Sequence, residues 1–181
     1  MLEKILLAVA AVVVVLVIVV ALQPAEYRVA RSTAIAVPPA AVFAHVNDLH
    51  DFQVWNPFAK LDPAARNTFE GPPAGTGAAM AWSGNSQIGA GRMTITESRP
   101  SELVRMRLDF LKPFAATAVA EFTFVPEGGR TVVTWSMTGR RNFVAKAMGL
   151  VMSMDSMVGG RFDTGLAALK SLSEVTGAAR P

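Results

Sequence analysis

The sequence predicts an α+β fold in which a curved antiparallel sheet of seven strands surrounds one long C-terminal helix, with one transmembrane helix preceding the domain. Three observations support this prediction. An apolar run lies near the N-terminus, short segments of alternating apolar and polar residues fill the middle of the chain, and a segment with helical spacing follows them. Because a single helix has to cover one face of the sheet, we expect a cavity between the two layers.

The apolar run covers residues 5–22, which contain only Ala, Val, Leu and Ile. At about 1.5 Å per residue, a helix of this length measures roughly 27 Å, close to the hydrocarbon thickness of a bilayer. A helix that is apolar on every side has no face for water. We therefore interpret residues 1–24 as a single-pass membrane anchor, 25–176 as a ligand-binding domain and 177–181 as a C-terminal tail.

Two other interpretations of this run remain open. Lys4 and the small residues that end at Ala21 resemble a cleaved signal peptide, although the apolar core of a signal peptide is usually only about 7–15 residues long. A buried core helix is disfavoured because β-branched valines are poor helix formers in water. Lys4 precedes the run and Arg28 and Arg31 follow it, so the basic residues do not decide which side of the membrane the domain faces.

Composition excludes several kinds of site. The net charge is only +3 and the arginines are scattered, so no nucleic-acid partner is expected, whereas the basic balance suits a domain near anionic lipid. The chain has no cysteine and two histidines, His45 and His50, which are five residues apart. We therefore expect no metal and no cofactor, and we assign both histidines to surface or helix-capping roles.

The domain opens with a predicted strand at 27–37, which ends at Pro38-Pro39. Proline is favoured in the first turn of a helix, so a short helix is expected from Pro39 to Asn47. A second helix or turn at 48–55 ends at Asn56-Pro57, because the residue before a proline is pushed out of the helical region.

Six further strands are expected between marks of glycine and proline. Their ranges are 67–70, 78–83, 92–98, 103–111, 115–125 and 131–139. Residues 127–130 form the turn of a hairpin. Alternation places a largely apolar set on the inner face and leaves Arg107 and Asp109 outside as a surface pair. The inner set is Met80, Trp82, Met93, Ile95, Met106, Leu108, Phe110, Phe122, Phe124, Trp135 and Met137.

Residues 142–175 have helical spacing and predict one long helix, with a possible bend at Gly159-Gly160. Methionine is frequent in its first half, and this flexible side chain lets a binding surface repack around different ligands. Asp155 lies among these methionines. We expect it either to approach the mouth of a pocket or to pair with an arginine such as Arg161 or Arg92.

The element order and several motifs resemble the helix-grip fold of the START-like superfamily, in particular its bacterial polyketide cyclase/dehydrase-like branch, often called SRPBCC. The likeness covers about residues 26–174. Two departures are Phe58, where a second tryptophan-type aromatic is common, and Arg161, where an acidic residue is frequent. The motifs are Trp55-Asn56-Pro57, Trp82-Ser83-Gly84-Asn85, Gly89-x-Gly91-x-Met93-x-Ile95, Leu111-Lys112-Pro113-Phe114, Val133-Thr134-Trp135-x-Met137-x-Gly139, and Met154-Asp155-x-Met157 ahead of Gly165-Leu166.

The resemblance implies a deep hydrophobic pocket, which the superfamily uses for lipids, sterols, polyketides, quinones and hormones. We therefore expect the chain to bind a hydrophobic small molecule, such as a lipid, quinone or polyketide-like compound, with membrane lipid as a further partner. Entry would involve movement of the last helix and of the segment 55–58. The residues predicted to bind the ligand are Trp55, Trp82, Met93, Met106, Phe110, Trp135, Met148 and Met152.

Two alternatives belong to other functional classes. A cyclase or dehydratase would need a titratable group that points into the pocket, and the inner set supplies almost none, so no catalytic residue is assigned. A non-catalytic interaction module at the membrane would instead show a filled interior and a contiguous exposed apolar patch. The shape and polar lining of the cavity separate these three functions.

Overall fold

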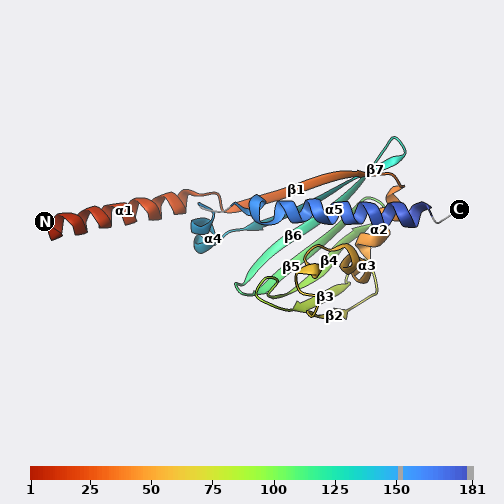
Figure 1. The fold of residues 1–181 in the computed structure, drawn as a ribbon, viewed down its shortest axis with the longest axis horizontal. Helices are drawn as coiled ribbons and strands as arrows, with labels where there is room; N and C mark the ends of the chain where they lie inside the picture. Colours follow the sequence, from red (N-terminus) through yellow and green to blue (C-terminus); the bar gives the residue numbers. More distant parts are fainter. Residues whose placement is uncertain (151–152, 179–181) are drawn as a thin grey trace.

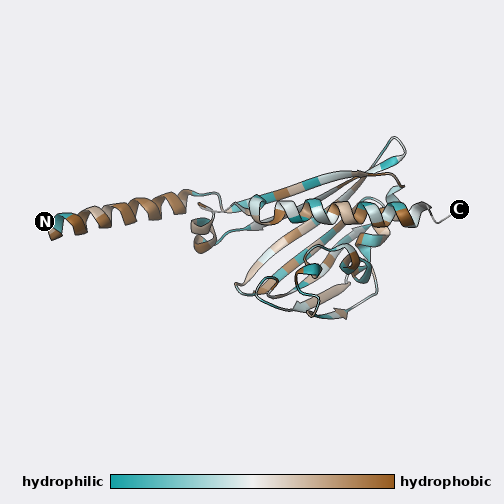
Figure 2. Ribbon diagram, in the orientation of Figure 1, coloured by the Kyte–Doolittle hydropathy of each residue, from teal (hydrophilic) through white to brown (hydrophobic). Residues whose placement is uncertain are grey.

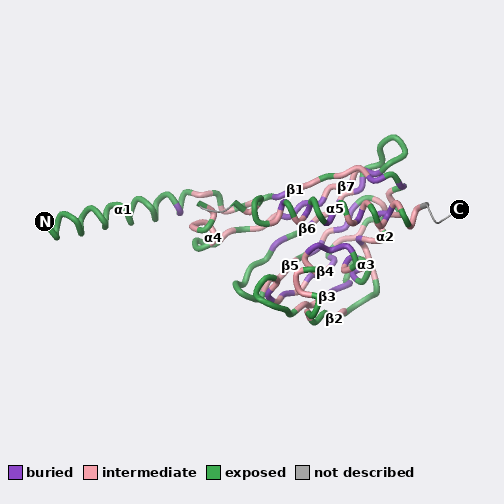
Figure 3. The backbone as a smooth tube through the Cα atoms, in the orientation of Figure 1, coloured by how far each residue is buried: buried purple, intermediate pink, exposed green. Residues whose placement is uncertain are grey.

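The N-terminal helix α1 (Leu2–Leu22) projects away from the rest of the molecule in the computed structural model, which describes residues 1–150 and 153–178 (Figure 1). Its surface is apolar beyond the charged first turn, which contains Glu3 and Lys4 (Figure 2), and it is exposed apart from Val20 (Figure 3). By length and composition, α1 is able to cross a bilayer. A signal sequence near the N-terminus would have the same properties.

The seven predicted strands form one antiparallel sheet, which confirms the predicted fold class. The order of the strands across the sheet is β1-β7-β6-β5-β4-β3-β2, so β2 to β7 form a meander and β1 adds to the free edge of β7. The strands are β1 (Glu26–Ile35), β2 (Arg66–Glu70), β3 (Ala79–Ser83), β4 (Ala90–Arg99), β5 (Leu103–Lys112), β6 (Ala116–Glu127) and β7 (Arg130–Arg140).

The two faces of the sheet differ in polarity, as the alternation predicts. Phe122 and Phe124 on β6 and Trp135 on β7 are buried on the inner face. On the outer face, Arg107 Nε lies 2.9 Å from Asp109 Oδ1, which confirms the predicted surface pair. Exposed pairs of this kind add little to stability, and the burial of the inner face supplies most of it.

Two short helices connect β1 to β2. Helix α2 (Pro39–Asn47) begins at a proline, and helix α3 (Leu49–Trp55) follows it after one residue. Asp48 separates them and caps α3, because its Oδ1 accepts a hydrogen bond of 2.7 Å from the backbone N–H of His50. A single 3-10 turn, η1 (Ala59–Leu61), precedes β2.

The C-terminal segment differs from the prediction of one helix over 142–175. It contains a short helix, α4 (Phe143–Met148), and a long helix, α5 (Met154–Ala178). Each helix has its own N-terminal cap: Asn142 Oδ1 accepts from Ala145 N at 2.8 Å, and Ser153 Oγ accepts from Ser156 N at 3.0 Å. Apolar spacing runs through both helices, so the spacing alone did not reveal the boundary.

Helix α5 continues through Gly159 and Gly160, the position at which the sequence allowed a bend. A side chain at Gly159 would collide with the guanidinium of Arg31, whose Cζ would lie 2.9 Å from the added Cβ. Arg31 lies across the helix at this point and binds Asp155 at 2.8 Å and Asp163 at 3.2 Å. The partner of Asp155 is thus Arg31, neither Arg161 nor Arg92.

Aromatic side chains dominate the core where α3 and α5 meet the sheet. The indole of Trp135 is stacked between Phe122, with ring centroids 5.0 Å apart, and Phe162 of α5, at 4.0 Å. Trp55 and Phe52 meet this stack edge-on. Helix α5 contacts β1, α2 and α3, so it covers the β1 side of the inner face and leaves the inner face of β3 to β5 for a cavity.

Candidate ligand-binding site

A cavity of about 390 Å³ lies between the inner face of the sheet and the N-terminal half of α5. Its walls come from β3 to β7, from α3 and the segment after it, and from α5. The volume falls within the range of about 300–1,000 Å³ that is usual for small-molecule sites. The aromatic and methionine side chains of the lining are Phe52, Phe58, Met80, Trp82, Met93, Met106, Phe110, Phe114, Trp135, Met137, Met157 and Phe162.

The structure brings together five of the eight residues that were predicted to bind a ligand. Trp82, Met93, Met106, Phe110 and Trp135 all line the cavity, and they come from four different strands. Their side chains share the inner face because each lies at an inward position of its strand. Period-two alternation was the signal that identified them.

Two of the other three predicted residues, Trp55 and Met148, are not among the described residues that line the cavity. Trp55 is 1% exposed and lies in the core, where its Nε1 donates to the backbone oxygen of His45 at 2.9 Å. Met148 belongs to α4 and is 51% exposed. Met152 falls outside the residues that the structure describes.

Several lining residues were missed by the strand pattern. Phe52 lies on α3, Phe58 follows that helix, and Phe114 lies in the turn between β5 and β6. Met157 lines the cavity from the first turns of α5. Alternation carries no information about loops and says little about which turn of a helix meets a sheet, so these positions could not be identified from period alone.

Three polar side chains of the lining, those of Gln53, Asn56 and Asp62, form local hydrogen bonds, and those of Asn67, Gln87 and Lys112 form none within the described residues. Gln53 Nε2 donates to Met80 Sδ at 3.0 Å, and Asn56 Oδ1 accepts from Phe58 N at 3.1 Å. Both carboxylate oxygens of Asp62 accept backbone N–H groups, from Ala64 at 3.1 Å and Asn85 at 2.6 Å. Asp62 is the only carboxylate among the described residues that line the cavity. These bonds fix the loops at the rim of the cavity.

Trp135 differs from these residues because its polar atom is buried. Its Nε1 is buried and has no hydrogen-bond partner in the part of the chain that the structure describes. The indole N–H of Trp82, in contrast, donates to the backbone oxygen of Ile88 at 3.1 Å. An unpaired buried donor costs free energy, about 1–3 kcal/mol, until an acceptor reaches it. Trp135 thus contributes its ring to the cavity lining, while its N–H is a buried donor without a partner among the described residues.

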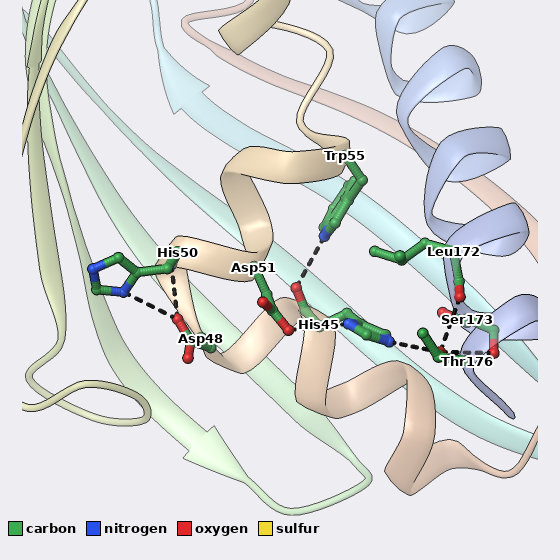
Figure 4. Close-up of polar contacts among 8 residues, drawn as sticks. All are labelled: His45, Asp48, His50, Asp51, Trp55, Leu172, Ser173 and Thr176. Atoms are coloured by element: carbon green, nitrogen blue, oxygen red, sulfur yellow. Dashed lines mark hydrogen bonds and ion pairs between the residues drawn. The ribbon is translucent and has the colours of Figure 1, made fainter. Parts of the chain in front are cut away.

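A cluster of polar side chains lies outside the cavity, where α2, α3 and the end of α5 meet (Figure 4). His45 Nδ1 lies 3.1 Å from Asp51 Oδ2, and its Nε2 lies 3.1 Å from Thr176 Oγ1. An acid, a histidine and a hydroxyl in this order resemble a nucleophilic site. However, the Thr176 hydroxyl donates to the backbone oxygen of Leu172 at 2.9 Å. The cluster therefore joins three helices, and neither His45, Asp51 nor Thr176 is among the described residues that line the cavity.

The two histidines have different surroundings. The side chain of His45 is 15% exposed and connects α2 to α3 and α5 through Asp51 and Thr176. His50 is 59% exposed, and its ring is stacked on Phe69 at 3.8 Å. Among the residues that the structure describes, no group of three or more His, Cys, Asp or Glu side chains could hold a metal ion.

Comparisons with known proteins agree with this geometry. Residues 26–174 match the family model described as polyketide cyclase / dehydrase and lipid transport. A comparison with curated protein sequences finds no match.

Several solved structures have the same fold. Protein CV1439 from Chromobacterium violaceum shares 15% identity at a TM-score of 0.58, over 84% of this chain and 99% of that one. Protein MLL2253 from Mesorhizobium loti shares 17% at 0.59, over 83% and 98%. Protein Ms6760 from Mycobacterium smegmatis shares 16% at 0.56, over 82% and 92%. At these identities the likeness shows the fold alone.

Proposed function

Because the chain belongs to the polyketide cyclase/dehydrase and lipid transport family, a branch of the START-like superfamily, we propose that it binds a hydrophobic small molecule in the cavity between sheet and helix. A lipid, a quinone or a polyketide-like compound would fit this description. The observation that carries the proposal is a cavity of about 390 Å³ with walls of Trp, Phe and Met. Burial of apolar ligand surface there would contribute about 25 cal/mol per Å².

The lining suits a ligand that is mostly apolar, with polar contacts available from Asn67, Gln87 and Lys112. Gln53, Asn56 and Asp62 already have partners within the protein. The N–H of Trp135 has none among the described residues. A ligand oxygen would reach this donor only if the aromatic side chains around it moved, because the nitrogen is buried between Phe122 and Phe162.

The anchoring of the domain is the second part of the proposal. Helix α1 would span the bilayer once, and residues 1–24 would hold the domain next to the membrane. Only Gln23, Pro24 and Ala25 separate α1 from β1. The cavity would then exchange its ligand with the bilayer over a short distance, so membrane lipid is both the surroundings and a source of ligand.

The test is to identify what copurifies with the full chain. The chain is extracted in detergent, and organic extraction with mass spectrometry compares it with two variants of β6. Ala120→Phe adds a ring on the inner face, where Ala120 lines the cavity, whereas Val119→Phe adds the same ring on the outer face. We expect an apolar molecule with the wild type and Val119→Phe, and its loss in Ala120→Phe. No apolar molecule in any sample, or equal amounts in all three, would contradict the proposal.

A cyclase or dehydratase is the second candidate function, because Asp62 and Lys112 line the cavity. An acid or base would need a lone pair or proton aimed at the ligand, and each Asp62 oxygen accepts one backbone N–H group, which stabilises the ionised carboxylate in its place at the rim. We therefore expect Asp62→Asn to loosen the rim without changing the chemical identity of the bound molecule. A substrate-like molecule that accumulates only in the Asp62→Asn variant would support the enzyme instead.

A further inference from the structure

Three connecting segments of the chain lie at the same end of the sheet, where β1 and β6 begin and β5 and β7 finish. The register pairs Glu26 with Arg140, Gly139 with Ala118, and Ala116 with Phe110. The start of β1, the end of β7, the start of β6 and the end of β5 therefore lie side by side. The helix α1, the helix α4 and the turn between β5 and β6 all leave the sheet at this end (Figure 1). We call it the α1 end of the domain.

Exposed apolar side chains gather at the α1 end. Those of α4 and the residues after it are large and between 41% and 59% exposed, and those of the β5–β6 turn are 63% and 69% exposed. Elsewhere in the domain, apart from Met157 near the start of α5, the exposed large apolar side chains are the separate valines Val54, Val119, Val125 and Val175. The residues of the apolar group are Leu111, Phe114, Phe143, Val144, Met148 and Leu150.

Helix α4 is attached to the end of α1. Val20 is the one residue of α1 that is buried, and Lys146 Nζ donates to the backbone oxygen of Ala21 at 3.1 Å. The last turn of α1 has no basic residue of its own, so Lys146 supplies the positive charge that stabilises the C-terminus of a helix. The contact holds the apolar side chains of α4 next to the point where α1 leaves the domain.

Positive charge surrounds the same end. Arg28, Lys112 and Arg140 are exposed there, and none of them forms an ion pair within the part of the chain that the structure describes. Elsewhere in the sheet, Arg92, Arg105 and Arg107 each bind a carboxylate, whereas Arg66 and Arg130 form no ion pair within the described residues. Glu26 lies at the α1 end and reduces the local charge without cancelling it.

We propose that the α1 end docks on the surface of the bilayer that α1 spans, with the apolar group inserted among the lipids and the basic residues at anionic headgroups. This inference rests on the anchoring part of the proposed function. An apolar surface with a basic border is the composition of protein surfaces that lie in a membrane interface. Phe114 and Met157 belong to the cavity lining and are also exposed, so docking would place the mouth of the cavity against lipid.

The chain contains no cysteine, so single nitroxide labels can be placed at will. The full chain is reconstituted in vesicles of phosphatidylcholine with about 30 mol% anionic phosphatidylglycerol. Val144→Cys places the label on α4, and Val125→Cys places it at the other end of the sheet, beside the β6–β7 turn. The two valines are matched, with exposures of 59% and 55%.

Electron paramagnetic resonance then compares two relaxation reagents. Oxygen concentrates in lipid and a nickel chelate stays in water, so docking predicts that the Val144 label collides mainly with oxygen and the Val125 label mainly with the chelate. Lys112→Gln with Arg140→Gln should cause a loss of oxygen collisions at Val144. Chelate collisions as frequent at Val144 as at Val125 would overturn the proposal. A Val144 label shielded from both reagents would also overturn it and would indicate a protein partner.

Two further readouts separate the docking from the function on which it rests. A label at Val13→Cys reports whether α1 lies in lipid, and anilinonaphthalene sulfonate fluorescence, compared between the wild type and Ala120→Phe, reports on the cavity. If Val13 lies in lipid and the probe binds while Val144 stays in water, the docking is wrong and the proposed function stands. If Val144 lies in lipid and the probe does not bind, the docking stands and ligand binding fails.

Discussion

At the scale of single residues, the wall of the cavity depends on a glycine. Trp82 and Gly91 are cross-strand partners on β3 and β4, and the indole lies over the glycine. An added Cβ at Gly91 would collide with Cζ2 of the Trp82 ring and would lie 2.7 Å from the backbone oxygen of Asp109. Because Gly91 has no side chain, the Trp82 indole can lie close to β4 and leaves more space for the cavity.

Gly91→Ala should push the Trp82 ring away from the sheet and toward the ligand. We expect the affinity for an apolar ligand to fall about tenfold, which corresponds to about 1.4 kcal/mol. Titration of an apolar fluorescent probe measures this effect. Gly160→Ala is the control, because nothing lies within 4 Å of a Cβ at that position. An unchanged affinity in Gly91→Ala would mean that the Trp82 wall does not contact the ligand.

The residue scale also shows why the site was only partly predictable. Trp135, Phe122 and Trp55 all belong to apolar patterns, yet only Trp135 lines the cavity. Alternation tells which side chains point inward, and five of the eight predicted residues were found in this way. It does not tell which part of the inner face is covered by α5. Which part of the inner face α5 covers depends on tertiary packing and cannot be predicted from a local sequence pattern.

At the scale of elements, α5 is held at both ends by charged groups. Near its start, Asp155 and Asp163 bind Arg31 of β1. Near its end, Glu174 Oε1 accepts from the backbone N–H of Ala36 at 2.9 Å. The split between α4 and α5 was missed because the apolar spacing continues through both helices. The start of the second helix is marked only by the cap Ser153. The strands were easier to predict, since a period of two over several residues is typical of a strand with one buried face.

The two adjacent glycines of α5 should respond in opposite directions to alanine. Gly160→Ala should raise the free energy of unfolding by about 0.5–1 kcal/mol, because alanine favours a helix. Gly159→Ala gains the same propensity but displaces Arg31 from Asp155, so we expect it to lower stability relative to Gly160→Ala. Denaturant unfolding of the two variants measures the difference. Equal stabilisation in both variants would show that the ion pair between Arg31 and Asp155 does not need the space left by Gly159.

Acid should weaken both attachments of α5. The hydrogen bond from Arg31 lowers the pKa of Asp155 below its usual value of 3.8, and the backbone N–H of Ala36 lowers the pKa of Glu174 below 4.5. Because the pKa of each carboxyl is lower in the folded state than in the unfolded state, each contributes stability above its unfolded pKa and loses it as the pH falls through the folded pKa.

The thermal midpoint should therefore fall as the pH is lowered from about 6 to about 3. Asp155→Asn removes one of the two titrating groups, so we expect it to be less stable at neutral pH and to lose less stability on acidification. Calorimetry of the wild type and this variant measures both effects. Parallel curves for the two proteins would show that Asp155 does not contribute to the pH dependence.

At the scale of the whole molecule, helix α1 and the domain with the cavity are separate parts joined by a short linker. Val20 is the only buried residue of α1, whereas the domain has a continuous core of its own. The sequence predicted both parts because each has a strong pattern, an unbroken apolar run or an alternation. It could not predict that the exposed apolar residues of α4 lie beside α1, since this depends on the register of β1 and β7.

Removal of residues 1–24 should leave ligand binding intact and slow the exchange of ligand with vesicles. The cavity contains no residue of α1, so the affinity in detergent should stay within about twofold of the full chain. Transfer of a fluorescent apolar ligand from vesicles, followed over time, should become dependent on vesicle concentration when the anchor is absent. If the shortened and full chains exchange ligand equally fast, the anchor has no role in delivery.

The two halves of α5 are attached to the domain by different interactions, buried apolar contacts in the C-terminal half and an exposed ion pair near the start. Its C-terminal half is fixed by Leu166 and Leu169, which are 2% and 0% exposed. Its first turns form a wall of the cavity through Met157 and are tied to β1 through Arg31, whose partner Asp155 is 57% exposed. Salt screens exposed charges far more than it affects buried apolar contacts. Higher ionic strength should therefore weaken the attachment of the first turns of α5 more than the attachment of its C-terminal half.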